Sequence, residues 1–198
     1  MSFTTGTLLQ RESEIIIRLY CQSGEWDAVR QIVIAENRLQ MRTLNASKRI
    51  FQEISSRLRL LNPPQQQLLL DGSYQEQKHL LWLAVCRRYR FIYDFAVAVI
   101  REKFLRLDFH LSYNDYDIFF NNKAEWHPEV ERVAASTRRK QRQVIFKMLR
   151  EAELLSADNH IVPCLLSPSL IQTLHAHETA DFAIFPAREV DIERWGNA

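Results

Sequence analysis

Residues 80–100 read LLWLAVCRRYRFIYDFAVAVI, and this stretch decides the fold. A membrane span needs about 20 mostly apolar residues, so the length alone would allow one. However, Arg87, Arg88 and Arg90 interrupt the stretch, and each central charge costs about 2.5–3.5 kcal/mol on insertion into a bilayer. We therefore predict a buried helix pair over about 75–106 and no membrane segment. Its expected core positions are Leu80, Leu83, Ala84, Phe91, Phe95, Val99 and Ile100.

Apolar residues at helical spacing predict further helices on both sides of this pair. The helices expected before it cover residues 8–22, 25–36 and about 47–61, and the third of these is stopped by Asn62-Pro63-Pro64. The helices expected after it cover residues 112–127, 128–135, 136–155 and 167–178. Only four glycines and six prolines occur in the chain, which disfavours a β-sandwich.

One segment predicts a strand. Residues 159–166, NHIVPCLL, are short and interrupted by Pro163, which suits an edge or wing strand. The fold class is therefore mainly α: a helical protein with helix-turn-helix-like units and a small β wing near the C-terminus. We expect an N-terminal helix-turn-helix-like unit over 1–64, a central helical core over 65–111 and a C-terminal winged-helix-like unit with an acidic tail over 112–198. The three are expected to pack as one compact body.

The bulk composition fits a globular protein that keeps reduced thiols. The chain has 198 residues, 46% of them hydrophobic and 25% charged, with a net charge of only +2. Cys21, Cys86 and Cys164 are far apart and odd in number, so they give no disulfide framework. The first residues lack the basic region of a secretory signal. These features predict a cytoplasmic protein.

The near-neutral total hides strong charge segregation. Residues 136–150 read STRRKQRQVIFKMLR, with six bases and no acid from Arg138 to Arg150, whereas residues 151–198 hold eight acids and two bases. Residues 38–59 hold six bases and one acid. Bases near a helix N-terminus cost about 0.3–1 kcal/mol each, because they face the positive end of the helix dipole. A solvated surface face is the simplest explanation, but the single sign favours an anionic partner such as a phosphate backbone.

Two stretches place Ser or Thr and then two bases at the start of an amphipathic helix: 45–61 and 135–155. Each follows a short apolar helix, which is the order of a helix-turn-helix unit. In the winged form the second helix enters the major groove of DNA. Gln143 could read adenine, whereas Gln141 is expected to face the core. With few base-reading candidates, the pattern predicts recognition of phosphates and shape with little sequence preference.

The chain resembles the BrxA family of the BREX (bacteriophage exclusion) phage-defence systems. The resemblance is carried by AENRLQMRTLNASKRIFQEISSRL (35–58), YRFIYDFAVAVIREKF (89–104) and STRRKQRQVIFKMLREAELL (136–155) with the following IVPCLLSP. It implies a non-enzymatic, mostly helical protein that binds double-stranded DNA and works beside other BREX components. Glu153 departs from the pattern, since a glycine is expected to end the helix there. The resemblance carries two basic segments onto this chain, Ser47-Lys48-Arg49 and Thr137-Arg138-Arg139-Lys140.

Together, charge and resemblance predict no catalytic residue, metal ligand or cofactor. The residues expected to bind nucleic acid are Ser47, Lys48, Arg49, Ser136, Thr137, Arg138, Arg139, Lys140, Arg142 and Lys147. Alternatives remain open: a protein–protein adaptor whose basic faces dock acidic partners, or an RNA-binding helical protein. A nuclease using Asp71 and Glu76 is less favoured, and so is a zinc site built from Cys164 and His175-Ala176-His177-Glu178.

Overall fold

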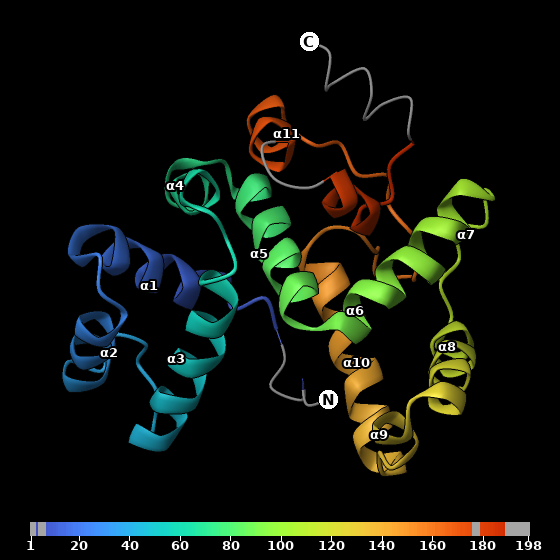
Figure 1. The fold of residues 1–198 in the computed structure, drawn as a ribbon, viewed down its shortest axis with the longest axis horizontal. Helices are drawn as coiled ribbons and strands as arrows, with labels where there is room; N and C mark the ends of the chain where they lie inside the picture. The colour runs from blue at the N-terminus through green and yellow to red at the C-terminus, as the bar shows by residue number, and fades with distance from the viewer. Residues whose placement is uncertain (1–2, 4–6, 176–178, 189–198) are drawn as a thin grey trace.

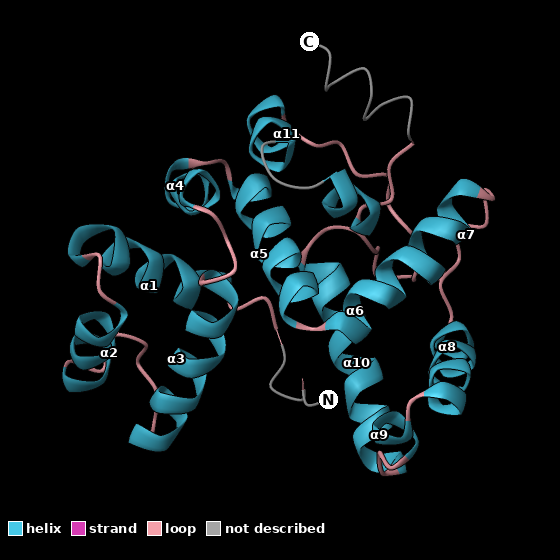
Figure 2. Ribbon diagram, in the orientation of Figure 1, coloured by secondary structure: helices cyan, strands magenta, loops and turns pink. Residues whose placement is uncertain are grey.

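The computed structural model describes residue 3, residues 7–175 and residues 179–188 of the chain. Helices joined by loops make up this described part (Figures 1 and 2). The mainly helical class predicted from the sequence is therefore confirmed. The predicted acidic tail beyond residue 188 lies outside the described residues.

The first three helices form one group, at the left of Figure 1. They are α1 (Gln10–Ser23), α2 (Trp26–Ala35) and α3 (Leu44–Leu58). The predicted break after α1 is confirmed, because Gly24 takes the left-handed conformation (φ 70°) that closes the helix. α3 begins three residues before the predicted start, because the Thr43 side chain accepts a hydrogen bond from the Ala46 N–H and caps the helix. Ser47 therefore lies inside the helix.

The central stretch forms the buried helix pair that the sequence predicts. α4 (Pro63–Asp71) leads into α5 (Tyr74–Arg88), followed by α6 (Arg90–Phe95), the π-helix η1 (Ala96–Arg101) and α7 (Glu102–Leu105). Every residue from Leu80 to Cys86 is at most 2% exposed. Burying a large apolar side chain contributes about 1.5–3 kcal/mol, so α5 is the main element of the core. None of the helices in the described part has the length and apolar character needed to cross a bilayer.

The C-terminal part packs against this pair. It contains α8 (Tyr113–Trp126), α9 (Pro128–Glu131), α10 (Ala135–Glu151), α11 (Pro168–His175) and the 3₁₀-helix η2 (Thr179–Ile184). The Trp82 indole N–H donates to the Ile184 carbonyl at 3.2 Å, which fixes η2 on α5. One hydrophobic cluster includes side chains from all three predicted segments, from Ile16 through Leu83 to Leu149. The division at residues 64 and 111 remains a prediction.

The small β wing predicted over residues 159–166 is wrong. Within the described residues this segment makes only isolated bridges, His110↔His160 and Leu155↔Ile161. Its main-chain groups are shared among three neighbours: Val162 N donates to Leu154 O, Ile161 N to Phe109 O, and Cys164 N to Pro186 O. Because Pro163 has no N–H to donate and the partners change at almost every residue, no ladder extends.

The turn that follows α10 contains Glu153, at the position where a glycine is expected from the sequence. Glu153 adopts φ 60°, and the Leu154 N–H donates to the Leu149 carbonyl at 2.9 Å, which closes the helix. A residue other than glycine pays about 1–2 kcal/mol in this left-handed conformation. The Glu153 side chain forms an ion pair with Lys78 at 2.6 Å and is 51% exposed.

Glu153→Gly is therefore expected to be more stable than Glu153→Ala by about 1 kcal/mol, because both remove the carboxylate but only glycine relieves the backbone. Urea unfolding of the two variants and the parent chain measures this difference. Equal stability of the glycine and alanine variants would show that the turn is unstrained.

Candidate nucleic-acid interface

α10 separates an apolar inner side from a basic outer side. Its N-terminus has no side-chain cap, because Ala134 occupies the capping position and Ser136 and Thr137 lie within the first turn. The inner side that the helical spacing predicts is confirmed, since its members are all at most 3% exposed: Gln141, Val144, Ile145, Met148 and Leu149. Gln141 is thus a core residue and cannot reach a ligand.

Arg138 and Arg142 fasten α10 to α8. The Arg138 Nε donates to Asp117 Oδ1 at 2.9 Å, its Nη1 to Asn121 Oδ1 at 2.8 Å and its Nη2 to the Asp117 carbonyl at 3.0 Å. Arg142 Nη1 pairs with the second Asp117 oxygen. The two guanidinium groups also lie 4.5 Å from the ring centroids of Phe120 and Tyr113, respectively. One carboxylate thus serves two cations, and both arginines have a structural role that the sequence did not reveal.

The exposed polar side chains of α10 form a row that we call the outer stripe: Ser136, Arg139, Lys140, Gln143 and Lys147. Their spacing of three or four residues places them along one side of the helix. Arg139 and Lys140 pair with no carboxylate in the part of the chain that the structure describes. Lys147 pairs only loosely with Glu151, at 3.8 Å. The outer stripe is therefore a row of largely uncompensated positive charge, whereas Thr137 beside it is half-buried.

The basic segment of α3 is smaller than predicted. Lys48 and Arg49 are exposed and have no carboxylate partner among the described residues. Ser47 is only 2% exposed, so its hydroxyl cannot contact a ligand and we leave it out of the interface. The N-terminal ends of α3 and α10 both lie toward the lower edge of the molecule in Figure 1. The structure thus presents two basic helix starts on the same edge.

The carboxylates considered for a nuclease already accept hydrogen bonds within the protein, and that of Glu76 belongs to a helix cap. Glu76 Oε2 accepts from the Ser73 N–H at 2.7 Å, and its other oxygen accepts from the Ser167 hydroxyl. The Ser167 hydrogen bond holds the pKa of Glu76 below its usual range. Asp71 accepts from the Gln67 amide on the same helix. Neither group is placed as a free metal ligand, which favours the capping interpretation over catalysis.

The zinc interpretation finds no support in the described residues. Cys164 is 5% exposed, and burial raises the pKa of its thiol well above the ordinary value. Its nearest polar neighbour is His79 Nε2, at 3.5 Å. His177 and Glu178 lie outside the described residues. Elsewhere in the described chain no group of three or more His, Cys, Asp or Glu side chains is placed to hold a metal ion.

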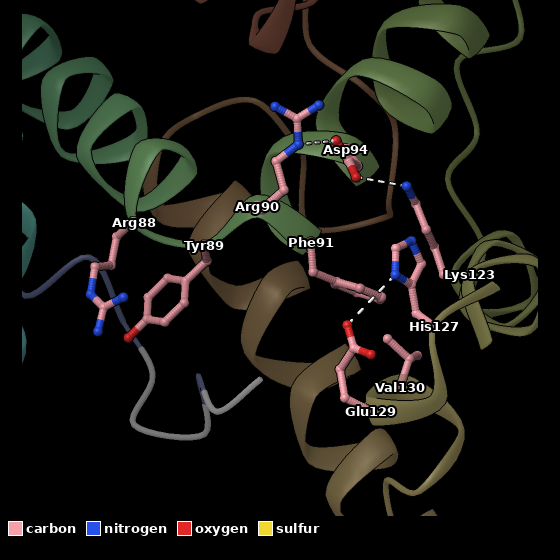
Figure 3. A pocket seen from close by; sticks show the side chains of 9 residues that line it. All are labelled: Arg88, Tyr89, Arg90, Phe91, Asp94, Lys123, His127, Glu129 and Val130. Carbon is pink, nitrogen blue, oxygen red and sulfur yellow. Dashed lines mark hydrogen bonds and ion pairs between the residues drawn. The ribbon is translucent and has the colours of Figure 1, made fainter.

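A cavity of about 450 Å³ opens where the α5–α6 junction meets α8 and α9 (Figure 3). Asp94 accepts from Arg90 Nε at 2.8 Å and from Lys123 Nζ at 2.6 Å, so it bridges two cations across the cavity. His127 lies beside Lys123 in Figure 3, and its Nδ1 is 3.6 Å from Glu129 Oε1. Because Asp94 is already paired with two cations, the cavity is a weaker candidate site than the outer stripe.

Comparisons with known proteins agree with the resemblance. The family model BrxA matches residues 1–178. A BREX protein BrxA of Escherichia coli O9:H4 (strain HS) is 26% identical over 147 residues, which is 74% of this chain and 69% of the relative. A BREX protein BrxA of Bacillus cereus (strain H3081.97) is 28% identical over 127 residues, 64% of each chain. The crystal structure of an uncharacterized protein from Magnetospirillum magneticum has the same fold, with a TM-score of 0.80 at 23% identity, covering 92% of this chain and 96% of that one.

Proposed function

This chain belongs to the BrxA family, and from that premise we propose that it is a non-enzymatic, double-stranded DNA binding component of a BREX anti-phage defence system. The two BREX relatives support the membership in such a system. The proposal places the protein in the cytoplasm, beside the other BREX components and the DNA. No cofactor is required for this role.

The outer stripe is the single observation that carries the DNA-binding part. Arg139 and Lys140 lie near the N-terminus of α10, where a positive charge is unfavourable within the protein itself. Phosphate oxygens would accept from these side chains and from the free N–H groups of the first helical turn. Lys48 and Arg49 on α3 would provide a second contact to the same backbone.

We further propose that α9 and α10 act as a helix-turn-helix unit without a wing. Three residues, 132–134, connect the two helices, which is the connection length typical of this motif. α10 would then be the recognition helix, and the Gln143 amide could contact the edge of an adenine. Such an interface predicts little sequence preference, because the other four side chains contact phosphates.

A salt series with duplex DNA, single-stranded DNA and RNA of matched length tests the proposal. We expect the duplex to bind best, with log K falling against log salt at a slope of about −4 to −5, since each of the five exposed cations that neutralises a phosphate contributes about −0.9. A preference for RNA would favour the RNA-binding alternative. Absence of binding to all three nucleic acids would refute the proposal.

The adaptor function is the second candidate, and exposed apolar side chains support it. Leu107 is 76% exposed and adopts φ 62°, and Trp126 is 81% exposed at the end of α8. Exposed apolar groups of this size are typical of protein contacts when they gather into a patch. A pull-down of other BREX components that survives nuclease treatment would support an adaptor, whereas loss of the partners on nuclease treatment would show that DNA bridges them.

A further inference from the structure

A basic groove of about 560 Å³ lies between α3 and the last turn of α5. Figure 1 shows α3 beside the lower end of α5, the two elements that supply most of the residues that line the groove. None of the described residues that line it is acidic: Gln52, Ser55, Ser56, Arg59, Leu60, Arg87 and Arg88. This composition suits an anionic ligand, and neither the charge pattern of the sequence nor the resemblance assigned a function to this place.

Arg59 and Arg88 are held in position by aromatic rings rather than by carboxylates. The Arg59 guanidinium carbon lies 5.2 Å from the Trp26 ring centroid, and that of Arg88 lies 5.2 Å from the Tyr89 ring. Arg88 Nε also donates to the Ser56 hydroxyl at 3.3 Å. Both arginines are exposed, and neither pairs with an acid in the described part of the chain. A guanidinium held on an aromatic face keeps its N–H edge available for a ligand and loses less freedom on binding.

The helix ends alone do not account for these two arginines. Cations are favourable at helix C-termini, and both α3 and α5 end at the groove. However, Gln66 Nε2 donates to the Leu58 and Leu61 carbonyls, and Arg87 Nη1 donates to the Leu60 carbonyl at 2.6 Å. Arg87 is also neutralised by Asp181 at 2.5 Å. Gln66 and Arg87 thus satisfy the carbonyls at the end of α3, and Arg59 is not needed there. Arg88 likewise donates to the Ser56 hydroxyl and not to a helix-end carbonyl.

We propose that this groove binds phosphate groups of a nucleic-acid backbone and is a second contact surface, separate from the outer stripe. The inference rests on the proposed DNA binding. One guanidinium satisfies both oxygens of a carboxylate, whereas a phosphodiester can accept from two guanidinium forks and from short polar donors at once. The groove offers such a set, namely Arg59, Arg88 and the Gln52 amide. An acidic segment of a partner protein would leave part of it unused.

The test measures duplex affinity over a salt series for the full chain and for R59A/R88A. We expect roughly a 10–100-fold loss of affinity near 0.1 M salt and a salt slope less negative by about two, since two phosphate contacts are lost. R18A/R106A removes the same charge from two exposed sites on α1 and α7 and should leave the slope nearly unchanged. R59K/R88K keeps the charge without the fork, so it should retain most of the slope and lose only part of the affinity.

Melting of each variant separates a folding defect from a lost contact. If R59A/R88A melts early, the duplex affinity of R59K/R88K decides instead, because loss of the guanidinium forks should weaken binding even where the charge is kept. Unchanged affinity and slope in the arginine variants, with the parent still binding the duplex, would overturn the groove but leave the outer stripe standing. If R59A/R88A lost the parent's binding to a fluorescent poly-glutamate peptide but still bound the duplex like the parent, the groove would be assigned to an acidic protein partner and the phosphate proposal would be overturned. A parent chain that binds no duplex would refute both proposals.

Discussion

Replacement of Arg139, Lys140 and Lys147 by alanine is expected to lower duplex affinity by roughly 10²–10³-fold near 0.1 M salt, because each lost phosphate contact contributes about 0.9 to the salt slope and so about one decade at that concentration. The slope itself should become less negative by about 2.7. The loss should be similar for all duplex sequences, since these side chains are proposed to contact phosphates only. A salt series with two unrelated duplexes measures both quantities.

The fold should tolerate this triple change. The three side chains are exposed, and among the described residues only Lys147 has an acidic partner, Glu151 at 3.8 Å. Exposed ion pairs contribute at most about 1 kcal/mol. Removing two bases from near the helix N-terminus also relieves an unfavourable interaction with the helix dipole. The melting temperature should therefore stay close to that of the parent chain, so a loss of affinity reports on contacts.

Arg138→Ala provides the opposite control. This side chain makes three hydrogen bonds to α8 and is 26% exposed. Its removal should lower the melting temperature, whereas the salt slope of duplex binding should change little. If the triple variant bound DNA as tightly as the parent while Arg138→Ala bound weakly without unfolding, the roles assigned to the two sides of α10 would have to be exchanged.

The helical part of the fold was predictable because local physics and tertiary packing agree there. Residues 80–86 are all apolar, and every one of them is at most 2% exposed in α5. Asn62 and Ser73 each begin a helix with a capping box that satisfies main-chain N–H groups reciprocally. The helical spacing correctly placed the polar Gln141 on the inner side of α10, because the position of a residue along a helix determines which side of the helix it lies on.

The features that were missed depend on partners distant in sequence. Asp117 lies 21 and 25 residues before the two arginines it pairs with, and nothing in the local pattern of α10 announces it. Asp117 and Asn121 are four residues apart and so lie on one side of α8. This polar pair was the one pattern in the sequence that could have indicated a contact with arginines of another helix. The prediction of a β wing was wrong for a similar reason: the N–H groups of Ile161 and Cys164 donate to the carbonyls of Phe109 and Pro186, which are distant in sequence, and not to a neighbouring strand.

The second large effect concerns His79, which is 2% exposed in the core. Its Nε2 lies 3.5 Å from the Cys164 sulfur, and its ring meets the edge of Phe185 at 5.7 Å. Burial lowers the pKa of His79 from 6.5 to about 4; the Lys78 charge acts in the same direction, and the Glu153 and Glu76 charges oppose it more weakly. The imidazole is therefore neutral in the folded protein, and protonation must be accompanied by loss of favourable packing or unfolding.

The chain should consequently lose stability as the pH falls from about 6.5 toward 4. Between these two pKa values the unfolded chain binds a proton that the folded chain does not, so the free energy of unfolding rises with pH in this window. A shift from 6.5 to about 4 corresponds to about 2 kcal/mol lost by pH 5 and about 3 kcal/mol by pH 4. Urea unfolding of the parent chain across this window measures the loss.

His79→Leu isolates the contribution of this residue, because leucine has no proton to gain. The variant is expected to be less stable than the parent at pH 7, where it loses the contact with Cys164, and the difference should shrink or reverse as the pH approaches 4. Taking the difference cancels the acid titration of the carboxylates that both chains share. His110→Gln, at an exposed position, is the control and should follow the parent. A parent-minus-variant difference that stays constant from pH 7 to pH 4 would mean that the imidazole is not held neutral by the core, and the acid sensitivity would then have to come from a carboxyl group with a lowered pKa, such as Glu76.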